Sequence, residues 1–215
     1  MNLLVLKSGN DVQRPIPPKN REHLSQSKIR ELLTVTIGVS NLRESVKLPL
    51  GEDINEWLAW NIVDFYKQVR LLCATLEELC TPTTCPVMKA GRYEYPSVDA
   101  ITGKRHTMGS APEYIESVID WIGTQIDNET LFPKNFGEPF PPNFEDIVKC
   151  ISRKLFRVYA HIYHNHFLTI VDAKGEAHLN TCFQHFVLFI SEYKLMVEEN
   201  ELAPLKELVE IILEP

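Results

Sequence analysis

The chain has 215 residues, of which 44% are hydrophobic and 24% are charged, as in a soluble globular protein with one core. A formal net charge of −7 disfavours nucleic acid and anionic membranes as partners, so a basic protein partner is favoured. No apolar run approaches the roughly 18 residues of a membrane span, and the apolar stretch at 3–6 is too short for a signal peptide. The five cysteines are odd in number and widely spread, which is not the pattern of a secreted disulfide framework. We therefore expect one principal domain with reduced thiols, located in the cytosol or nucleus.

The first 21 residues include Pro15, Pro17 and Pro18 and show little hydrophobic periodicity, which predicts a flexible N-terminal arm. Residues 22–215 form the expected domain. A first helix is predicted over 22–37, with Gly38 just after its end.

The clearest helical pattern follows a break at 48–51. Asp53 is suited to cap the N-terminus, and Glu56, three residues later, to return a bond to it as in a capping box. Apolar residues then recur at helical spacing, which predicts one long helix reaching residue 79. Residues 80–109 are rich in Thr, Pro and Gly, with one short strand expected around 93–95. So long a loop is uncommon in a compact domain unless something ties it down.

Capping signals place the remaining helices. Ser110 and Glu113 form a second capping-box pattern, before a helix expected to end near residue 127. After Pro-rich turns at 131–142, Asn143 is expected to cap a helix that reaches His161. Two more helices are predicted over 176–196 and 201–213. The predicted fold class is all-α.

A short cysteine pair and a distant histidine cluster suggest a metal site. Cys80 and Cys85 supply two thiolates, and His161, His164 and His166 supply imidazoles, which together suit a closed, structural, tetrahedral zinc site. Helical spacing favours His161 with His164, because a ligand at His166 requires the helix to end or bend. A catalytic zinc would also need an open position and a carboxylate base, which the 161–166 segment lacks. The alternative without a metal is a set of core thiols and surface imidazoles.

Two charged helix faces are candidate binding surfaces. Arg153, Lys154 and Arg157 lie within an arc of about 100° on one helix, which suits a phosphate group, although a solvated basic face explains the same triplet. Acidic residues of the long helix surround Trp57 and Trp60, as in a docking surface for a basic helix. The alternative is that the acids only favour the helix N-terminus and that Trp57 is core.

No nucleophile motif and no phosphate-binding glycine loop is present, so an enzyme is not predicted. His178 and His185, one to two helical turns apart, are interpreted from the residues alone as packing or surface residues.

Several segments occur in a recognisable order and at near-constant spacing. They are LPLGEDINEW at 48–57, LC at 79–80 with CP at 85–86, YEY at 93–95, LFP at 131–133, PFPPNF at 139–144, LFRVYAHIYH at 155–164 and HLNTCF at 178–183. These segments resemble the Mob (Mps-one-binder) family of kinase coactivators, from about residue 32 to the C-terminus. The resemblance implies a Mob-type helical fold around a four-helix bundle. It also implies one structural zinc bound by Cys80, Cys85, His161 and His166, so that His166 replaces His164 and the helix changes course after His164.

The resemblance is closest to the subgroup that activates nuclear Dbf2-related and Lats-type kinases, and it implies a coactivator without catalytic activity. An acidic surface would bind the basic N-terminal region of the kinase; its residues would be Glu52, Glu56, Trp57, Trp60, Asp64 and His185. Trp60 stands where a small aliphatic residue is usual, which would reshape the kinase groove. Arg153, Lys154 and Arg157 match the family's pocket for a phosphothreonine of an upstream Ste20-like kinase, and Thr36 matches a regulatory phosphorylation site.

The implied role is in growth control of the Hippo type, mitotic exit or cytokinesis, in the cytoplasm, in the nucleus, and at spindle poles or the division site. The alternative function is a phosphopeptide-binding adaptor in a phosphatase–kinase assembly that activates no kinase. The acidic surface distinguishes the two, because only a coactivator needs it.

Overall fold

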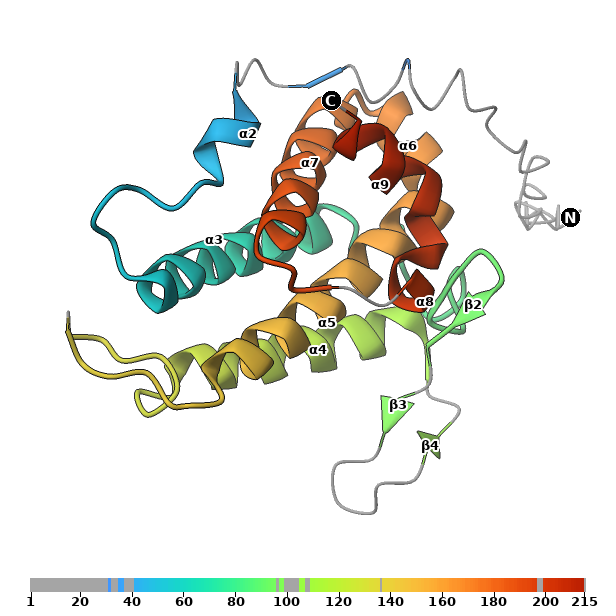
Figure 1. The fold of residues 1–215 in the computed structure, drawn as a ribbon. Helices are drawn as coiled ribbons and strands as arrows, with labels where there is room; N and C mark the ends of the chain where they lie inside the picture. The colour runs from blue at the N-terminus through green and yellow to red at the C-terminus, as the bar shows by residue number, and fades with distance from the viewer. Residues whose placement is uncertain are drawn as a thin grey trace, which may run out of the picture.

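Figure 1 shows the computed structural model of the chain, which is built mainly of helices. It describes residues 31, 35–36, 41–95, 97–98, 105–106, 109–135, 137–196 and 199–214. The predicted arm at 1–21 and most of the first predicted helix lie outside these residues. Val35 and Thr36 are not helical, so the prediction of a helix reaching residue 37 was wrong. A tertiary contact competes with the helix there, because Asn180 Nδ2 donates a hydrogen bond of 3.1 Å to the backbone oxygen of Val35.

A short helix, α2 (Leu42–Ser45), contacts the C-terminal segment of the chain and was not predicted. The Asn41 side chain caps it by accepting a hydrogen bond from the backbone N–H of Glu44 at 3.3 Å. Arg43 Nη2 then donates to the backbone oxygen of Ile212, near the C-terminus, at 2.8 Å. After α2 the chain turns at Gly51, whose φ of 89° suits a residue without Cβ.

The long predicted helix is α3 (Ile54–Thr75), and its Asp53 cap is confirmed. Asp53 Oδ1 accepts from the backbone N–H groups of Asn55 and Glu56 at 2.8 and 3.2 Å. Among the described residues Glu56 returns no bond to Asp53, so the cap is one-sided rather than a capping box. The helix ends four residues before the predicted end at 79, because residues 76–79 form turns that lead into the cysteine loop.

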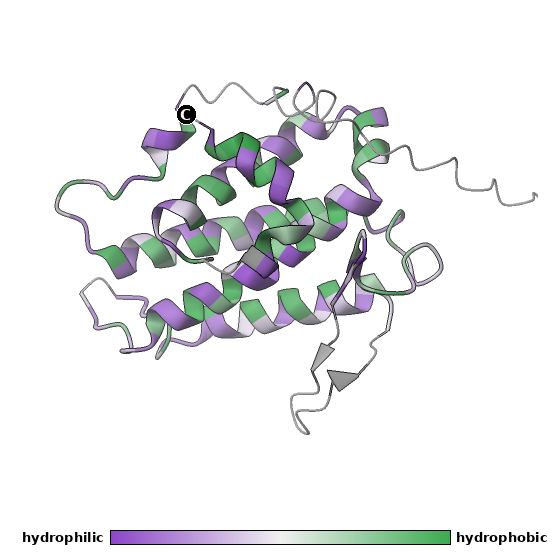
Figure 2. Ribbon diagram, turned by 45° about the vertical axis from the view of Figure 1, so that its right-hand side comes forward, coloured by the Kyte–Doolittle hydropathy of each residue, from purple (hydrophilic) through white to green (hydrophobic). Residues whose placement is uncertain are grey.

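The next two helices agree with the predicted boundaries. In α4 (Ala111–Asp127) the capping box is present, with the Glu113 carboxylate accepting from the backbone N–H of Ser110 at 2.8 Å. Helix α5 (Phe144–Asn165) begins after Asn143 as expected, although the Asn143 side chain makes no capping bond. Along both helices hydrophobic and hydrophilic residues alternate, as expected of helices with one buried face (Figure 2).

Between α3 and α4, the strand predicted around 93–95 is present as β2 (Tyr93–Glu94), and three further two-residue strands of the described residues, which were not predicted, accompany it in two antiparallel pairs. Strand β1 (Lys89–Ala90) pairs with β2 (Tyr93–Glu94) and β3 (Ser97–Val98) with β4 (Arg105–His106), both antiparallel. Strand β1 packs against α5. The long loop is therefore tied to the helical core.

The C-terminal third has more breaks than predicted. Helix α6 (Phe167–Asp172) was missed, and α7 (Glu176–Glu192) ends four residues before the predicted 196. The last predicted helix is divided into α8 (Glu199–Leu202), a 3-10 turn η1 (Ala203–Leu205) and α9 (Lys206–Leu213). Pro204 explains this division, because proline lacks the N–H that a continuous helix needs.

Helices α3, α4, α5 and α7 form the four-helix core, as predicted. An aromatic cluster joins α3, α5 and α7: the Phe65 ring lies 5.3 Å from both Phe186 and Phe189, and Tyr159 lies 5.2 Å from Phe183. These residues are fully buried. The helices of the described residues include none that has both the length and the hydrophobicity to cross a bilayer.

Candidate metal centre and binding surfaces

Two cysteines and two histidines from distant parts of the chain meet in one buried cluster. Cys80 Sγ lies 3.4 Å from His161 Nε2, Cys85 Sγ lies 3.5 Å from His166 Nε2, and the two Nε2 atoms lie 3.3 Å apart. All four ligand atoms lie within 4.8 Å of one another. Around a tetrahedral ion with bonds of about 2.0–2.3 Å, two nitrogens would lie about 3.3 Å apart and a sulfur and a nitrogen about 3.5 Å. The cluster therefore has the dimensions of a tetrahedral metal site.

Neighbouring groups orient the His161 ring. Its Nδ1 donates to the backbone oxygen of Lys89 in β1 at 2.8 Å, which leaves the Nε2 lone pair facing the cluster. Asn165 Nδ2 donates to the same oxygen at 2.9 Å. Burial, together with the nearby Cys85, raises the pKa of the Cys80 thiol to about 12. A bound cation would reverse this preference, because metals bind the thiolate and release its proton.

Local structure presents each ligand. Thr81 and Thr84 close the cysteine loop, since the Thr84 hydroxyl donates to the Leu79 backbone oxygen at 2.7 Å and accepts from the Thr81 N–H at 2.9 Å. On the other side α5 ends at Asn165, and His166, with φ of −126°, forms the junction with α6. This bend turns the His166 ring toward His161. The change of course that the family resemblance implied is confirmed.

The preference for His164 from helical spacing was wrong. His164 Nε2 donates instead to the backbone oxygen of Pro204 at 2.7 Å. Its ring also lies against Gly91, where an added Cβ would come within 3.1 Å of the ring. Spacing failed because it assumes an uninterrupted helix, whereas α5 stops one residue before His166.

These positions predict different outcomes for two histidine variants. His166→Ala is expected to remove a ligand and lower the bound metal of the purified protein from one equivalent to well below half. His164→Ala is expected to keep the full equivalent and to lose about 1 kcal/mol of stability with the Pro204 bond. Elemental analysis of the two proteins, alongside thermal unfolding, checks both expectations. If His164→Ala loses the metal and His166→Ala keeps it, His164 and not His166 is the fourth metal ligand.

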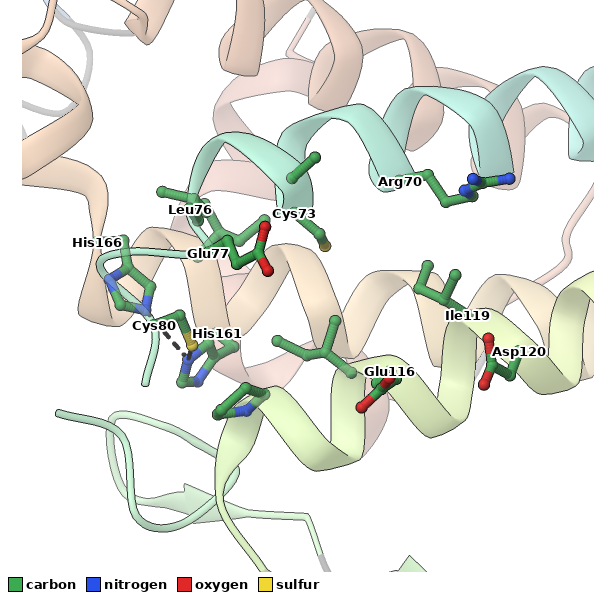
Figure 3. A pocket seen from close by; sticks show the side chains of 14 residues that line it. Arg70, Cys73, Leu76, Glu77, Cys80, Glu116, Ile119, Asp120, His161 and His166 are labelled. Atoms are coloured by element: carbon green, nitrogen blue, oxygen red, sulfur yellow. Dashed lines mark hydrogen bonds between the residues drawn. The ribbon is translucent and has the colours of Figure 1, made fainter. Parts of the chain in front are cut away.

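A cavity of about 310 Å³ lies beside the cluster, between α3 and α4. Figure 3 shows the ligands Cys80, His161 and His166 at one end of it and Arg70 and Asp120 at the other. Leu76 and Ile119 are among its apolar lining residues. Cys73 also lines the cavity; burial raises the pKa of its thiol to about 12, so it stays protonated at neutral pH.

The three predicted cations of α5 lie together, but two of them already have partners. Lys154 Nζ lies 4.8 Å from the centre of the Trp121 ring in α4, and burial, with the charges of Arg157 and Arg153, lowers its pKa. Arg157 forms an ion pair of 2.8 Å with Glu201 of α8. Among the described residues Arg153, which is half-buried, has no ion-pair partner. Trp121 and Glu201 were missed because nothing in the local sequence links them to α5.

The predicted acidic surface lies where α3 meets α7. Glu56, Trp60 and Asp64 follow one another at intervals of four residues on α3, so they share a helix face. Trp60 is 74% exposed. His185 of α7 is held edge-on to the Phe65 ring at 5.0 Å; burial lowers its pKa, which the Asp64 carboxylate partly opposes.

The other predicted members of this surface are placed differently. Glu52 is exposed just before the helix, whereas Trp57 is half-buried, with its Nε1 donating to the backbone oxygen of Val46 at 3.2 Å. Trp57 thus anchors the segment after α2 against α3. Thr36, the predicted phosphorylation site, is half-buried beside Val35, whose backbone is bonded to α7.

The chain is a helical bundle protein with a buried Cys₂His₂ cluster at the end of α5. Comparisons with known proteins identify its family. Residues 34–205 match the Mob1/phocein family. The chain is 60% identical to "MOB kinase activator-like 2A" of Arabidopsis thaliana over 212 residues, 98% of each chain. It is 52% identical to "MOB kinase activator-like 1A" of Medicago sativa subsp. falcata over 217 residues, 100% of each, and 49% identical to "MOB kinase activator-like 1 homolog A" of Dictyostelium discoideum over 207 residues, 95% of this chain and 97% of the relative. The chain belongs to the Mob1/phocein family, as the resemblance predicted.

Proposed function

We propose that this protein is a non-catalytic kinase coactivator that binds the basic N-terminal region of a nuclear Dbf2-related or Lats-type Ser/Thr kinase. Relatives named as kinase activators, 49–60% identical along nearly the whole chain, support a role in kinase activation. The proposed processes are growth control, mitotic exit or cytokinesis, in the cytoplasm, in the nucleus, and at spindle poles or the division site. Phosphorylation of Thr36 by the upstream kinase belongs to the same proposal.

The observation that carries the proposal is Trp60, an exposed indole in an acidic helix face. A tryptophan exposed by 74% between Glu56 and Asp64 suits a partner that supplies an apolar pocket and basic side chains. His185 closes the α7 side of this face, and its Nε2 is buried with no hydrogen-bond partner among the described residues. A bound helix could satisfy that nitrogen.

The basic triplet on α5 supports a second contact, with a phosphothreonine of an upstream Ste20-like kinase. Arg153, Lys154 and Arg157 lie within five consecutive positions of α5 and within an arc of about 100°, which suits one phosphate group. A dianionic phosphate is the ligand that would relieve their mutual repulsion best. A protein with both surfaces would bring the upstream kinase and its substrate kinase together.

The metal in the Cys₂His₂ cluster is proposed to be zinc with a structural role. Two thiolates and two imidazoles suit zinc, and all four coordination positions are filled by the protein. Such a site leaves no open position for a substrate. It supports a scaffold rather than a hydrolase.

The experiment that tests the coactivator surface is binding of the purified protein to the isolated basic N-terminal segment of a Dbf2-related kinase. Isothermal titration is expected to give tight binding by the wild type. Glu56→Lys reverses one charge of the acidic face and is expected to weaken binding by at least about tenfold, or about 1.4 kcal/mol. Glu78→Lys makes the same change at an exposed position beyond the other end of α3 and should bind like the wild type.

Kinase assays then separate the coactivator from the adaptor alternative. A coactivator raises the activity of the bound kinase, and Glu56→Lys loses that effect in proportion to its lost affinity. If the wild type does not bind the segment, the coactivator proposal fails. Binding of a phosphopeptide alone would then favour the adaptor.

A further inference from the structure

Arg157 is the most heavily engaged cation of the basic triplet. Its Nη2 donates to Glu201 Oε1 at 2.8 Å and to Oε2 at 3.2 Å, while Nε lies 3.4 Å from Oε2. One edge of the guanidinium is thus occupied by one carboxylate in the fork geometry that a phosphate would use. The two side chains are only 27% and 22% exposed, so water screens this pair less than a surface pair.

Two tyrosines occupy other parts of the same guanidinium. Tyr95 places its ring against it, with 5.4 Å between Cζ and the ring centre, and Tyr114 of α4 also interacts favourably with the charged guanidinium. Burial alone would lower the pKa of Arg157, but the interactions with Tyr114 and Glu201 outweigh burial and raise the pKa. Since Arg157 stays charged, its availability depends on its partners and not on its own protonation.

We propose that Glu201 is an internal competitor that holds Arg157 until a phosphoryl group displaces its carboxylate. The inference deepens the proposed function, because it assumes that the triplet binds a phosphorylated ligand. A carboxylate with one negative charge and a phosphate with nearly two compete for the same N–H donors. The phosphate also contacts Arg153 and Lys154, which Glu201 does not, so the exchange favours a phosphorylated ligand over an acidic one.

The fold confines the movement to the Glu201 side chain. Just beyond α8, Pro204 and Leu205 are buried, and the Pro204 backbone oxygen accepts the 2.7 Å bond from His164. The backbone next to Glu201 is therefore fixed to the end of α5. Rotation of a long, partly exposed side chain needs no rearrangement of the helices, so release is expected to be fast.

While Glu201 is paired with Arg157, one polar group beside the pair has no hydrogen-bond partner among the described residues. The Tyr95 hydroxyl is buried without a hydrogen-bond partner among the described residues, and burial raises its pKa, which keeps it a donor. A buried donor without an acceptor costs free energy, which would be recovered when an acceptor arrives. A phosphoryl oxygen bound at Arg157 is such an acceptor. This residue gives the ligand an advantage that the Glu201 carboxylate does not have.

The test compares Glu201→Gln with the wild type in binding a fluorescein-labelled nonapeptide that has a central phosphothreonine and apolar flanks. Removing the competing charge is expected to tighten binding about three- to tenfold by fluorescence anisotropy. The unphosphorylated peptide and the same peptide with glutamate at the centre should bind neither protein measurably. Glu207→Gln removes the same charge from an exposed position on α9 and should leave the affinity unchanged.

Each result decides something different. Tighter binding by Glu201→Gln, or binding by that variant alone, supports the internal competitor. Equal or weaker binding by Glu201→Gln, when the wild type binds, overturns it and makes Glu201 a positioning residue, while the phosphopeptide proposal stands. If neither protein binds the phosphopeptide and both unfold at similar temperatures, the proposed phosphothreonine site fails, and the competitor fails with it.

Discussion

Cys80→Ser is expected to abolish metal binding and cooperative unfolding of the purified protein. A structural zinc contributes roughly 10–16 kcal/mol of apparent binding free energy in small zinc domains, about as much as the whole stability of a typical domain. Serine cannot replace the thiolate, and the three remaining ligands are buried close together without the cation. We expect loss of the sharp thermal transition, or a midpoint lowered by more than about 10 °C.

The structure indicates which part is lost first. The loop after Cys80 is joined to α5 through the metal cluster and through the Lys89 oxygen that orients His161. Circular dichroism melts with and without a chelator, combined with metal analysis, measure the effect. Cys150→Ser changes a half-buried cysteine outside the cluster and is the matched control. A metal-free Cys80→Ser protein with the wild-type melting curve would contradict a structural role for the cluster.

The helices could be predicted where local signals agree with packing. The cap at Asp53, the capping box at Ser110 and the start of α5 after Asn143 lie at the expected positions. The first two depend on side-chain bonds within a few residues, which are visible in sequence, whereas α5 begins after Asn143 without a capping bond from that side chain. The predicted helix through Val35 failed because a bond to Asn180, 145 residues away, competes with helix formation there.

The family resemblance predicted all four residues of the metal cluster, whereas residue type and helical spacing alone predicted its composition but not its detail. The two ligand pairs follow from residue type, whereas the choice of His166 over His164 depends on where α5 ends. The cations of α5 were visible as a triplet, but their partner Glu201 lies 44 residues from Arg157 and on a helix that proline divides. Contacts of this kind are set by tertiary packing, which local sequence patterns do not record.

Arg157→Ala is expected to weaken phosphothreonine peptide binding about a hundredfold while leaving the affinity for the kinase segment within about twofold. The variant removes the guanidinium of the triplet that is already oriented toward an anionic group, the Glu201 carboxylate. A hundredfold loss of affinity corresponds to roughly 2.7 kcal/mol of binding free energy. Arg157 lies on α5, whereas the proposed kinase-binding surface lies around Trp60 on α3. Anisotropy with the phosphopeptide and titration with the kinase segment measure the two affinities on one preparation.

The single variant also leaves Glu201 without its cation, so the double variant Arg157→Ala with Glu201→Gln is needed beside it. Similar loss in both proteins assigns the effect to the missing guanidinium rather than to an unpaired carboxylate. Arg70→Ala removes a cation from the exposed side of α3 and should bind the phosphopeptide normally. Unchanged phosphopeptide affinity in both Arg157 variants would contradict the proposal that the phosphothreonine binds to the α5 triplet.

Loss of the metal is expected to disturb the proposed phosphate pocket, whereas a change in the pocket is expected to leave the metal bound. Arg157 and His161 stand about one turn apart on α5, and the segment that orients His161 through Lys89 continues to Tyr95, which packs on Arg157. Loss of the metal should therefore disturb the pocket, so Cys80→Ser should lose phosphopeptide binding even where it stays folded. Arg157→Ala changes none of the four residues of the metal cluster, so this variant should retain one equivalent of metal. Phosphopeptide binding by a metal-free, folded Cys80→Ser protein would show that the two sites are independent.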